Sequence, residues 1–346
     1  MIADHLASDE LARLETYLSR ERGASVQVIA HSRLHGGASR QTFTLDVTVD
    51  GAAEALILRR DPPDSLIDTD RAVEFAAYRT FAGTSVPVPE ALHLCEDQSV
   101  LGAPFFVMRK IPVGAAASPF QIAPYAPHEA ELGRQFFTHL GTIAAADAAG
   151  SPLARVVDRP TPNDAWRVAL DHWQKVAEAD AQEPQPILAA AFRRLRAHPP
   201  APAQKIAIVH GDYRSGNFLH DGEGQISAIL DWEMAHLGDP FEDLAWALDP
   251  LWSHFQPDSG AGLIGRGEAI ALWERASFCR FDPAAFQWWS LFASVKGMAI
   301  WLSAARAFAG GQNPDPVLAF SGWYCARRHD DILAARLTAG ARGALP

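Results

Sequence analysis

Three oxygen-bearing side chains near the middle of the sequence have the types and spacing needed to transfer a phosphoryl group. Asp212 and Asn217 stand five positions apart in the run HGDYRSGNF. In an Asp-x-x-x-x-Asn spacing, the carboxylate positions an attacking hydroxyl and the amide oxygen binds Mg²⁺. Asp231, in the run ILDWE, adds a second hard oxygen ligand. The sequence therefore predicts a phosphoryl-transfer centre, with Asp212 as the catalytic residue and Asn217 and Asp231 as metal ligands.

A hairpin is needed to bring the two metal ligands together. Its apolar arms are predicted at 218–219 and 226–230, with turn residues at 221–224 between them. Folding the second arm back on the first brings Asn217 and Asp231 to the same open end.

The longer run from HGDYRSGNF through ILDWEMAHLGDPFEDLAWAL resembles the aminoglycoside phosphotransferase-like kinases, of the APH and choline kinase type. It looks most like the branch related to the kinase domains associated with acyl-CoA dehydrogenases. The resemblance covers roughly residues 25–250. It implies an α+β, protein-kinase-like fold with two lobes, and ATP and Mg²⁺ as cofactors.

The resemblance also implies a nucleotide site in the N-terminal part of the chain. In the loop LHGGASR, backbone N–H groups and the Ser39 hydroxyl would approach a polyphosphate, although an ordinary hairpin turn also explains the two glycines. Arg59 occupies the place where the family commonly has a Lys that pairs with the α/β-phosphates and a helix Glu. Arg keeps the charge but has a different geometry, and Arg60 is a candidate substitute.

Two further nucleotide contacts follow from the resemblance. Glu74 is the expected helix partner of the basic residue, with a solvated Glu as the other interpretation. A linker at 107–112 would bind adenine through backbone groups, which makes Met108, Arg109 and Ile111 candidate nucleotide contacts. A buried edge strand without a ligand is the alternative.

Supporting roles are expected around the centre. We interpret His210 as a core hydrogen-bonding residue, because similar enzymes already have their base in the Asp. In similar proteins the Asp at the place of Asp243 accepts hydrogen bonds from the catalytic loop. Arg214, two positions after the base, is a candidate for contact with a substrate anion or the departing phosphate.

The run DPFE, at 239–242, favours a purely structural interpretation. Asp239 would cap a helix, Pro240 would take its first position, and Glu242 would complete a capping box. Basic residues stand among apolar ones in the C-terminal helices, which favours a neutral or anionic acceptor over a polycationic one. These are Lys296, Arg306, Arg327 and Arg328.

The elements that must position these residues divide the chain in two. We predict an N-terminal nucleotide-binding lobe at 1–108 and a mostly helical catalytic and substrate-binding lobe at 109–346. Apolar periodicity predicts the elements. The expected strands are 26–30, 42–49, 55–59 and two runs within 100–108; the expected helices are 6–18, 70–81, 129–149, 166–179, 187–196 and 283–308. The segment 112–127 is expected to be a loop that covers the cleft.

Composition excludes several classes of function. A net charge of −11 over 346 residues argues against a general nucleic-acid binder, which needs a clustered basic surface. The three cysteines lack CxxC spacing, so neither a disulfide framework nor a zinc site is indicated. No leader segment and no membrane-spanning apolar run is evident, and we expect a cytoplasmic protein.

The leading hypothesis is an ATP-dependent kinase that phosphorylates the hydroxyl of a small molecule. The absence of an activation segment and an Ala-Pro-Glu signal after Asp231 argues against a protein substrate. The resemblance suggests a hydroxyacyl compound or its CoA thioester, with an aminoglycoside as the alternative acceptor. Two other classes stay open: a metal-dependent phosphohydrolase and a nucleotide-binding module without catalysis. The oligomeric state is not predicted.

Overall fold

A five-stranded antiparallel sheet forms one end of the molecule. The computed structural model describes residues 5–34, 41–61, 70–118, 121–256, 258–311 and 313–341. The strands lie in the order β1-β2-β3-β5-β4. They are β1 (Val26–Leu34), β2 (Gln41–Val49), β3 (Ala52–Arg60), β4 (Ala91–Cys95) and β5 (Phe105–Arg109). With a mostly helical remainder, this confirms the predicted α+β, kinase-like fold class.

The prediction of two strands within 100–108 was wrong for the first of them. Residues Gln98–Leu101 form a short helix, α3, which the Asp97 side chain caps by accepting from the Ser99 N–H at 2.9 Å. Gly102 ends this helix at φ 78°, a conformation that favours glycine. The edge strand is instead β4, Ala91–Cys95, which pairs with β5.

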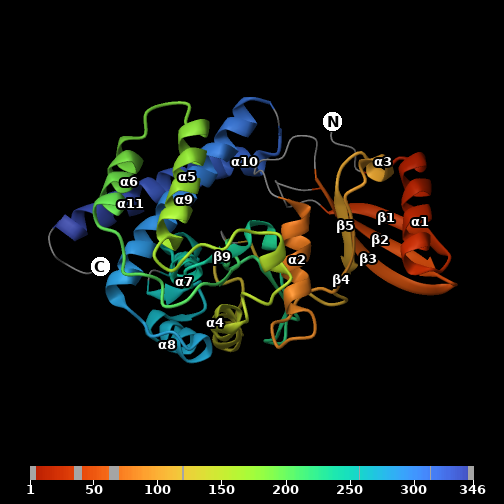
Figure 1. Ribbon diagram of the computed structural model, residues 1–346, viewed down its shortest axis with the longest axis horizontal. Helices are drawn as coiled ribbons and strands as arrows, with labels where there is room; N and C mark the ends of the chain where they lie inside the picture. The colour runs from red at the N-terminus through yellow and green to blue at the C-terminus, as the bar shows by residue number, and fades with distance from the viewer. Residues whose placement is uncertain are drawn as a thin grey trace.

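The two faces of the sheet are buried in different cores. In β3, Leu56 and Leu58 pack with α1 (Ser8–Arg22) and α3, whereas Ile57 packs with α2 (Arg71–Phe81). This alternation follows the two-residue period of a strand. The core around Ile57 continues into the helical part of the molecule, so α2 lies between the sheet and that part (Figure 1).

Two short strand pairs frame the predicted phosphoryl-transfer centre. In the first pair, β6 (Ala207–Val209) lies antiparallel to β9 (His236–Gly238). In the second, β7 (Phe218–His220) pairs with β8 (Ile226–Ile229), which is the hairpin expected from the sequence. The segment predicted to cover the cleft pairs with this hairpin, because Ala115 and His220 exchange backbone hydrogen bonds of 3.0 and 3.1 Å.

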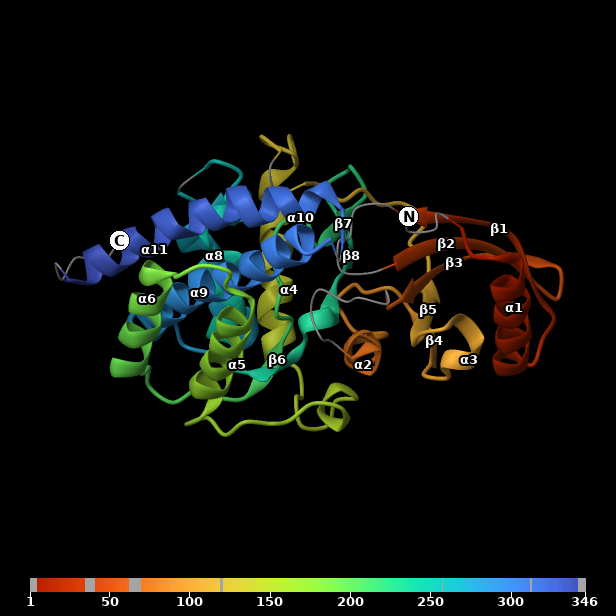
Figure 2. The ribbon, with the colours of Figure 1, turned by 90° about the horizontal axis from the view of Figure 1, so that it is seen from above.

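A long buried helix organises the rest of the molecule. Helices α5, α6, α7, α10 and α11 all contact α9, which runs through the helical part (Figure 2). The helices are α4 (Glu129–Ala145), α5 (Ala165–Asp180), α6 (Pro186–Ala197), α7 (Phe241–Ala247), α8 (Arg266–Ser277), α9 (Pro283–Ala309), α10 (Pro316–Phe320) and α11 (Ala326–Ala341), with a two-stranded β10 (Ser259–Gly260) and β11 (Ile264–Gly265). Among the described residues, no helix is both long and apolar enough to cross a membrane.

Candidate active site

The Asp212 carboxylate is held by three side chains. Asn217 Nδ2 donates to Oδ2 at 2.7 Å, Trp246 Nε1 donates to Oδ1 at 2.8 Å, and Arg214 Nε lies 3.1 Å from both oxygens. Burial raises the pKa of Asp212, and the Asp231 carboxylate adds to that shift, while Arg214 opposes it. A carboxylate that is fixed in place and made more basic is suited to accept a proton from a hydroxyl.

The backbone that delivers Asp212 is fixed by a second carboxylate. Asp243, on α7, accepts from the backbone N–H groups of His210 at 2.6 Å and Gly211 at 3.0 Å. Gly211 has φ 85°, and a Cβ there would lie 2.3 Å from the Met234 carbonyl oxygen, so a side chain is excluded at this position. Burial raises the pKa of Asp243 to about 6.

His210 is fully buried, and both of its ring nitrogens are used inside the protein. Nε2 lies 2.9 Å from the Leu230 carbonyl oxygen, and Nδ1 accepts from the Asp212 N–H at 3.1 Å. This pattern requires the neutral tautomer with its proton on Nε2. Burial lowers the pKa of His210 to about 3, which keeps the ring neutral. The geometry therefore suits a structural link between the catalytic loop and the hairpin.

Asp231 lies at the same end of the hairpin as Asn217, because the Leu230 N–H donates to the Asn217 carbonyl oxygen at 2.9 Å. The residue adopts φ 68°, and its N–H donates to the Tyr78 hydroxyl at 3.1 Å. Burial opposes ionisation, yet the Arg59 guanidinium beside it lowers the pKa of Asp231. Its side chain remains 31% exposed, so the ionised carboxylate is accessible to solvent.

Arg59 bridges the sheet, α2 and the hairpin. Its Nη1 lies 2.6 Å from Glu74 Oε1, and its Nη2 lies 2.8 Å from Asp231 Oδ1. Arg60 points to the other face of the sheet, where it binds Gln41 Oε1 at 2.8 Å and the Leu101 carbonyl oxygen at 3.1 Å. Arg60 is therefore not a substitute for Arg59.

The other residues predicted to contact the nucleotide lie in β5, just after β5, or outside the described residues. Ser39 lies outside the described residues. Met108 is buried in β5 opposite Ile57, and the Arg109 side chain turns to Glu90 Oε2 at 2.6 Å and Glu54 Oε2 at 3.1 Å. The Arg109 N–H donates to the Glu90 carbonyl oxygen at 2.9 Å. Ile111, which follows the strand, is partly exposed.

A buried ion-pair cluster supports the catalytic loop from behind. Lys296 Nζ, on α9, lies 3.0 Å from Glu242 Oε1 and also donates to the Gly211 carbonyl oxygen. Glu242 Oε2 lies 3.1 Å from His236 Nε2. Burial opposes ionisation, but His236 and Lys296 together lower the pKa of Glu242 to about 2.

This cluster corrects two predictions. Asp239 Oδ1 accepts from the Phe241 N–H at 2.9 Å, at the first residue of α7, but Pro240 and not Asp239 is the N-cap residue. The Glu242 side chain forms no capping box because it pairs with Lys296 and His236. The sequence places Lys296 and Arg306 among apolar residues, which predicts a neutral or anionic acceptor. Both have internal partners, Glu242 for Lys296 and Asp180 for Arg306, so they do not indicate the charge of an acceptor.

Sequence reasoning missed three aromatic side chains that position the site. Trp246 donates to Asp212, the Tyr78 hydroxyl accepts from the Asp231 N–H, and the Tyr125 hydroxyl accepts from the Gly216 N–H at 3.1 Å. Trp246 lies four residues after Glu242, but helical spacing does not distinguish a residue that faces the catalytic loop from one in the core.

The donor set fits a magnesium ion. Mg²⁺ in kinases binds one or two protein oxygen ligands and completes its coordination with phosphate oxygens and water. The ionised and accessible Asp231 carboxylate and the adjacent Asn217 amide supply ligands of that kind. Asn217 donates its Nδ2 hydrogens to Asp212, which leaves its amide oxygen free of that contact.

The fold and the site together define a kinase-like phosphotransferase. The family model described as "Phosphotransferase enzyme family" matches residues 31–279. The chain belongs to this family.

Individual relatives and solved structures agree with this assignment. Acyl-CoA dehydrogenase family member 10 of Mus musculus is 30% identical over 215 residues, which are 61% of this chain and 19% of that protein. The chain therefore spans about a fifth of the length of this relative. A crystal structure of an aminoglycoside phosphotransferase-type protein from Ralstonia eutropha has a TM-score of 0.72 at 20% identity, covering 94% of this chain and 97% of that one. Aminoglycoside phosphotransferase APH(4)-Ia, solved as a thermostable mutant with ADP and hygromycin B, has a TM-score of 0.57 at 20% identity, covering 95% and 99%.

Proposed function

We propose that the protein transfers the γ-phosphate of ATP to the hydroxyl of a small molecule. The observation that carries this proposal is the arrangement at the end of the hairpin, where Asp212 is hydrogen-bonded to Asn217 at 2.7 Å and Asp231 lies beside them with an accessible carboxylate. Phosphoryl transfer demands mainly alignment of the hydroxyl and neutralisation of charge on the transferring oxygens.

Each residue then has a distinct role. Asp212 orients the acceptor hydroxyl and takes its proton as the bond to phosphorus forms. Asn217 and Asp231 would hold Mg²⁺, which would neutralise charge on the phosphates. His210 and Asp243 act as supporting residues that keep Asp212 in position, through the backbone bonds at His210 and Gly211.

The nucleotide would lie between the sheet and the hairpin. Arg59, held by Glu74, would meet the phosphates on this side, and Ser39, between β1 and β2 in the sequence, would add a donor. The linker would contact the adenine through its backbone. Because the Arg109 N–H already donates to the Glu90 carbonyl oxygen, the Ile111 N–H is the better candidate for this contact.

For the acceptor we favour a hydroxyacyl compound, free or as its CoA thioester. Support comes from the similarity to an acyl-CoA dehydrogenase family member and from Arg214, a cation beside Asp212 whose guanidinium stacks 4.8 Å from the Trp252 ring centroid. Arg214 would contact an acceptor carboxylate or the departing phosphate. An aminoglycoside is the second candidate, favoured by the similarity to a structure that contains hygromycin B.

A screen for ADP formation tests the proposal. Purified protein with ATP and Mg²⁺ would be offered hydroxy acids, hydroxyacyl-CoA thioesters and aminoglycosides, each matched to the analogue that lacks the hydroxyl. We expect ADP formation that requires the hydroxyl and is fastest with the hydroxyacyl compounds. Faster turnover of aminoglycosides would replace the acceptor class, and nucleotide binding without turnover of any acceptor would favour a binding module.

Asp212→Asn separates catalysis from nucleotide binding. It keeps the size of the side chain but removes the base, so the rate of transfer should fall about 10³-fold. The thermal shift produced by ATP and Mg²⁺ should stay nearly unchanged, because Asp212 is not assigned to the nucleotide. An equal loss of both would show that Asp212 has been given the wrong role.

A further inference from the structure

Each oxygen of the Asp212 carboxylate already accepts two contacts. Oδ1 accepts from Trp246 Nε1 and Arg214 Nε, and Oδ2 accepts from Asn217 Nδ2 and the same Arg214 Nε. A carboxylate offers about four lone-pair sites in all. An acceptor hydroxyl that must donate its proton to Asp212 can therefore enter only where one of these three donors leaves.

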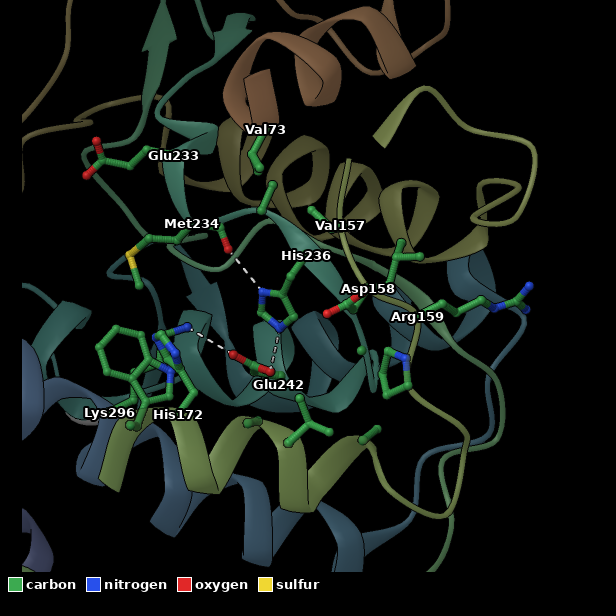
Figure 3. Close-up of a pocket in the computed structure, with 18 of the residues that line it drawn as sticks. Val73, Val157, Asp158, Arg159, His172, Glu233, Met234, His236, Glu242 and Lys296 are labelled. Carbon is green, nitrogen blue, oxygen red and sulfur yellow. Dashed lines mark hydrogen bonds and ion pairs between the residues drawn. The ribbon is translucent and has the colours of Figure 1, made fainter. Parts of the chain in front are cut away.

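Two of the donors are fixed by their surroundings. Trp246 is 1% exposed, and its ring centroid lies 5.3 Å from Lys296 Nζ, which pairs with Glu242 at 3.0 Å (Figure 3). Asn217 is 7% exposed, and its Nδ2 also donates to the Asp212 carbonyl oxygen at 2.9 Å. Neither side chain can move away without breaking contacts within the catalytic loop or the core.

Arg214 is the donor that can leave. Its side chain is 20% exposed. Apart from Asp212, its contacts are a 3.2 Å hydrogen bond from Nη1 to the Ser215 carbonyl oxygen and stacking 4.8 Å from the Trp252 ring centroid. A guanidinium group has more N–H donors than these contacts use, and Nη2 has no hydrogen-bond partner among the described residues. Donors are therefore available to an oxyanion that enters the site.

The surroundings of Arg214 indicate which oxyanion it would meet. Trp252, against which it stacks, packs with Trp301 of α9 at a ring-centroid distance of 6.3 Å, so the Arg214 guanidinium lies against the helical part of the molecule. The phosphates of the nucleotide are expected instead between the sheet and the hairpin, at Arg59. The oxyanion at Arg214 is therefore expected to come from the acceptor.

We propose that Arg214 occupies the place of the acceptor hydroxyl on Asp212 and gives it up to an anionic group of the acceptor. This role rests on the kinase function proposed for the site, and it selects acceptors in which a carboxylate or phosphate lies close to the hydroxyl. When Nε leaves Asp212 it rejoins the planar fork of the guanidinium, so the released side chain offers an oxyanion more donors than the bound one. An oxyanion therefore favours release, and the hydroxyl then donates to the freed carboxylate.

Hydrolysis of ATP without an acceptor tests this occupancy. Water brings a hydroxyl but no anionic group, so the native protein with Mg²⁺ should hydrolyse ATP slowly. Arg214→Met frees Asp212 and should hydrolyse ATP about tenfold faster, the factor that one hydrogen bond to a charged group supplies. Adding Asp212→Asn should remove the gain. Equal or slower hydrolysis by Arg214→Met would overturn the proposal and would fit a role of Arg214 at the phosphate.

Binding of 3-hydroxybutyrate, measured by ligand-observed NMR without nucleotide, tests the competition independently of catalysis. Asp212 and the ligand carboxylate compete for one guanidinium, so Asp212→Asn should bind 3-hydroxybutyrate about tenfold more tightly than the native protein. In the Arg214→Met background the same change should have a smaller effect, which separates competition from plain charge repulsion. An equal effect in both backgrounds, or no binding to the native protein and to Asp212→Asn, would contradict the proposal.

Arg193→Gln, at an exposed position of α6, is the control and should match the native protein in both measurements. Unfolding curves establish that each variant is folded. Tighter binding of 3-hydroxybutyrate by Asp212→Asn, without ADP formation from any acceptor, would keep the competition at Arg214 and reject the kinase function. Equal rates of ADP formation by the native protein with 3-hydroxybutyrate and with the uncharged 3-hydroxybutyramide would keep the kinase function and reject the selection by Arg214.

Discussion

Two buried ion-pair networks flank the catalytic loop, and they differ in how accessible their carboxylates are. In front, Arg59 bridges Glu74 and Asp231, and the Asp231 side chain is 31% exposed. Behind, Lys296 and His236 share Glu242, which is 1% exposed. A carboxylate that must exchange a cation for a metal needs access, whereas one that fixes the loop does not. We infer that the front network is built for exchange and the rear network for support.

Breaking the rear network should have the largest effect on stability. Glu242→Gln removes the carboxylate from the buried Lys296 ammonium and from the partly exposed His236 ring, and an uncompensated buried charge costs about 3 kcal/mol or more. The free energy of unfolding, measured by denaturant titration, should fall by about that amount. The exposed pair of Arg167 with Asp164 offers a matched control, because Asp164→Asn should leave the free energy of unfolding nearly unchanged.

A double variant sharpens this test. Lys296→Met in the Glu242→Gln background removes the stranded cation, so the double variant should be more stable than the sum of the two single changes predicts. Strict additivity would show that Lys296 and Glu242 do not act as a pair, and the rear network would then lose its role as a support.

The front network should respond with a smaller and different change. Arg59→Lys replaces the two guanidinium contacts with a single ammonium group. The variant should therefore keep the ion pair with Glu74 and lose the ion pair with Asp231. Since a hydrogen bond to a charged group contributes about 1.5 kcal/mol, the Mg²⁺ concentration for half-maximal ADP formation should fall by about tenfold. A higher requirement for Mg²⁺ would mean that Arg59 assists metal binding and does not compete with it.

The two networks also differ in how far the sequence predicts them. The front one joins residues that local patterns mark: a basic residue at the end of a strand, a Glu on the next helix and an Asp after a hairpin arm. The choice between Arg59 and Arg60 depended on which face of β3 each occupies, and the sequence left it open. Only the structure places Arg60 on the face toward α1 and α3.

The rear network had no such local pattern. Glu242 stands three residues after Asp239, a spacing that fits a capping box, and its real partners lie on β9 and on α9, 54 residues away. Lys296 lies in an apolar helix where its direction depends on packing. Helix α3 was mispredicted for a different, local reason. The cap at Asp97 and the left-handed Gly102 favour a helix more than the short apolar run favours a strand.

The smallest expected effect is a change in the pH dependence of stability, and it concerns the most exposed member of the rear network. Burial disfavours the imidazolium of His236, but the Glu242 carboxylate raises its pKa above the usual value of 6.5. The folded protein thus holds this proton more tightly than the unfolded chain. The stabilisation is complete below pH 6.5 and disappears as the pH rises through the folded-state pKa.

Other groups change in a different range, which isolates the effect. Burial lowers the pKa of His210 to about 3 and raises that of Asp243 to about 6, so both contribute their pH dependence below pH 6.5. As the pH rises above 6.5, the free energy of unfolding of the native protein should decrease relative to that of His236→Gln. Parallel curves for the two proteins over this range would mean that His236 is neutral in the folded state, and the rear network would then carry no second cation.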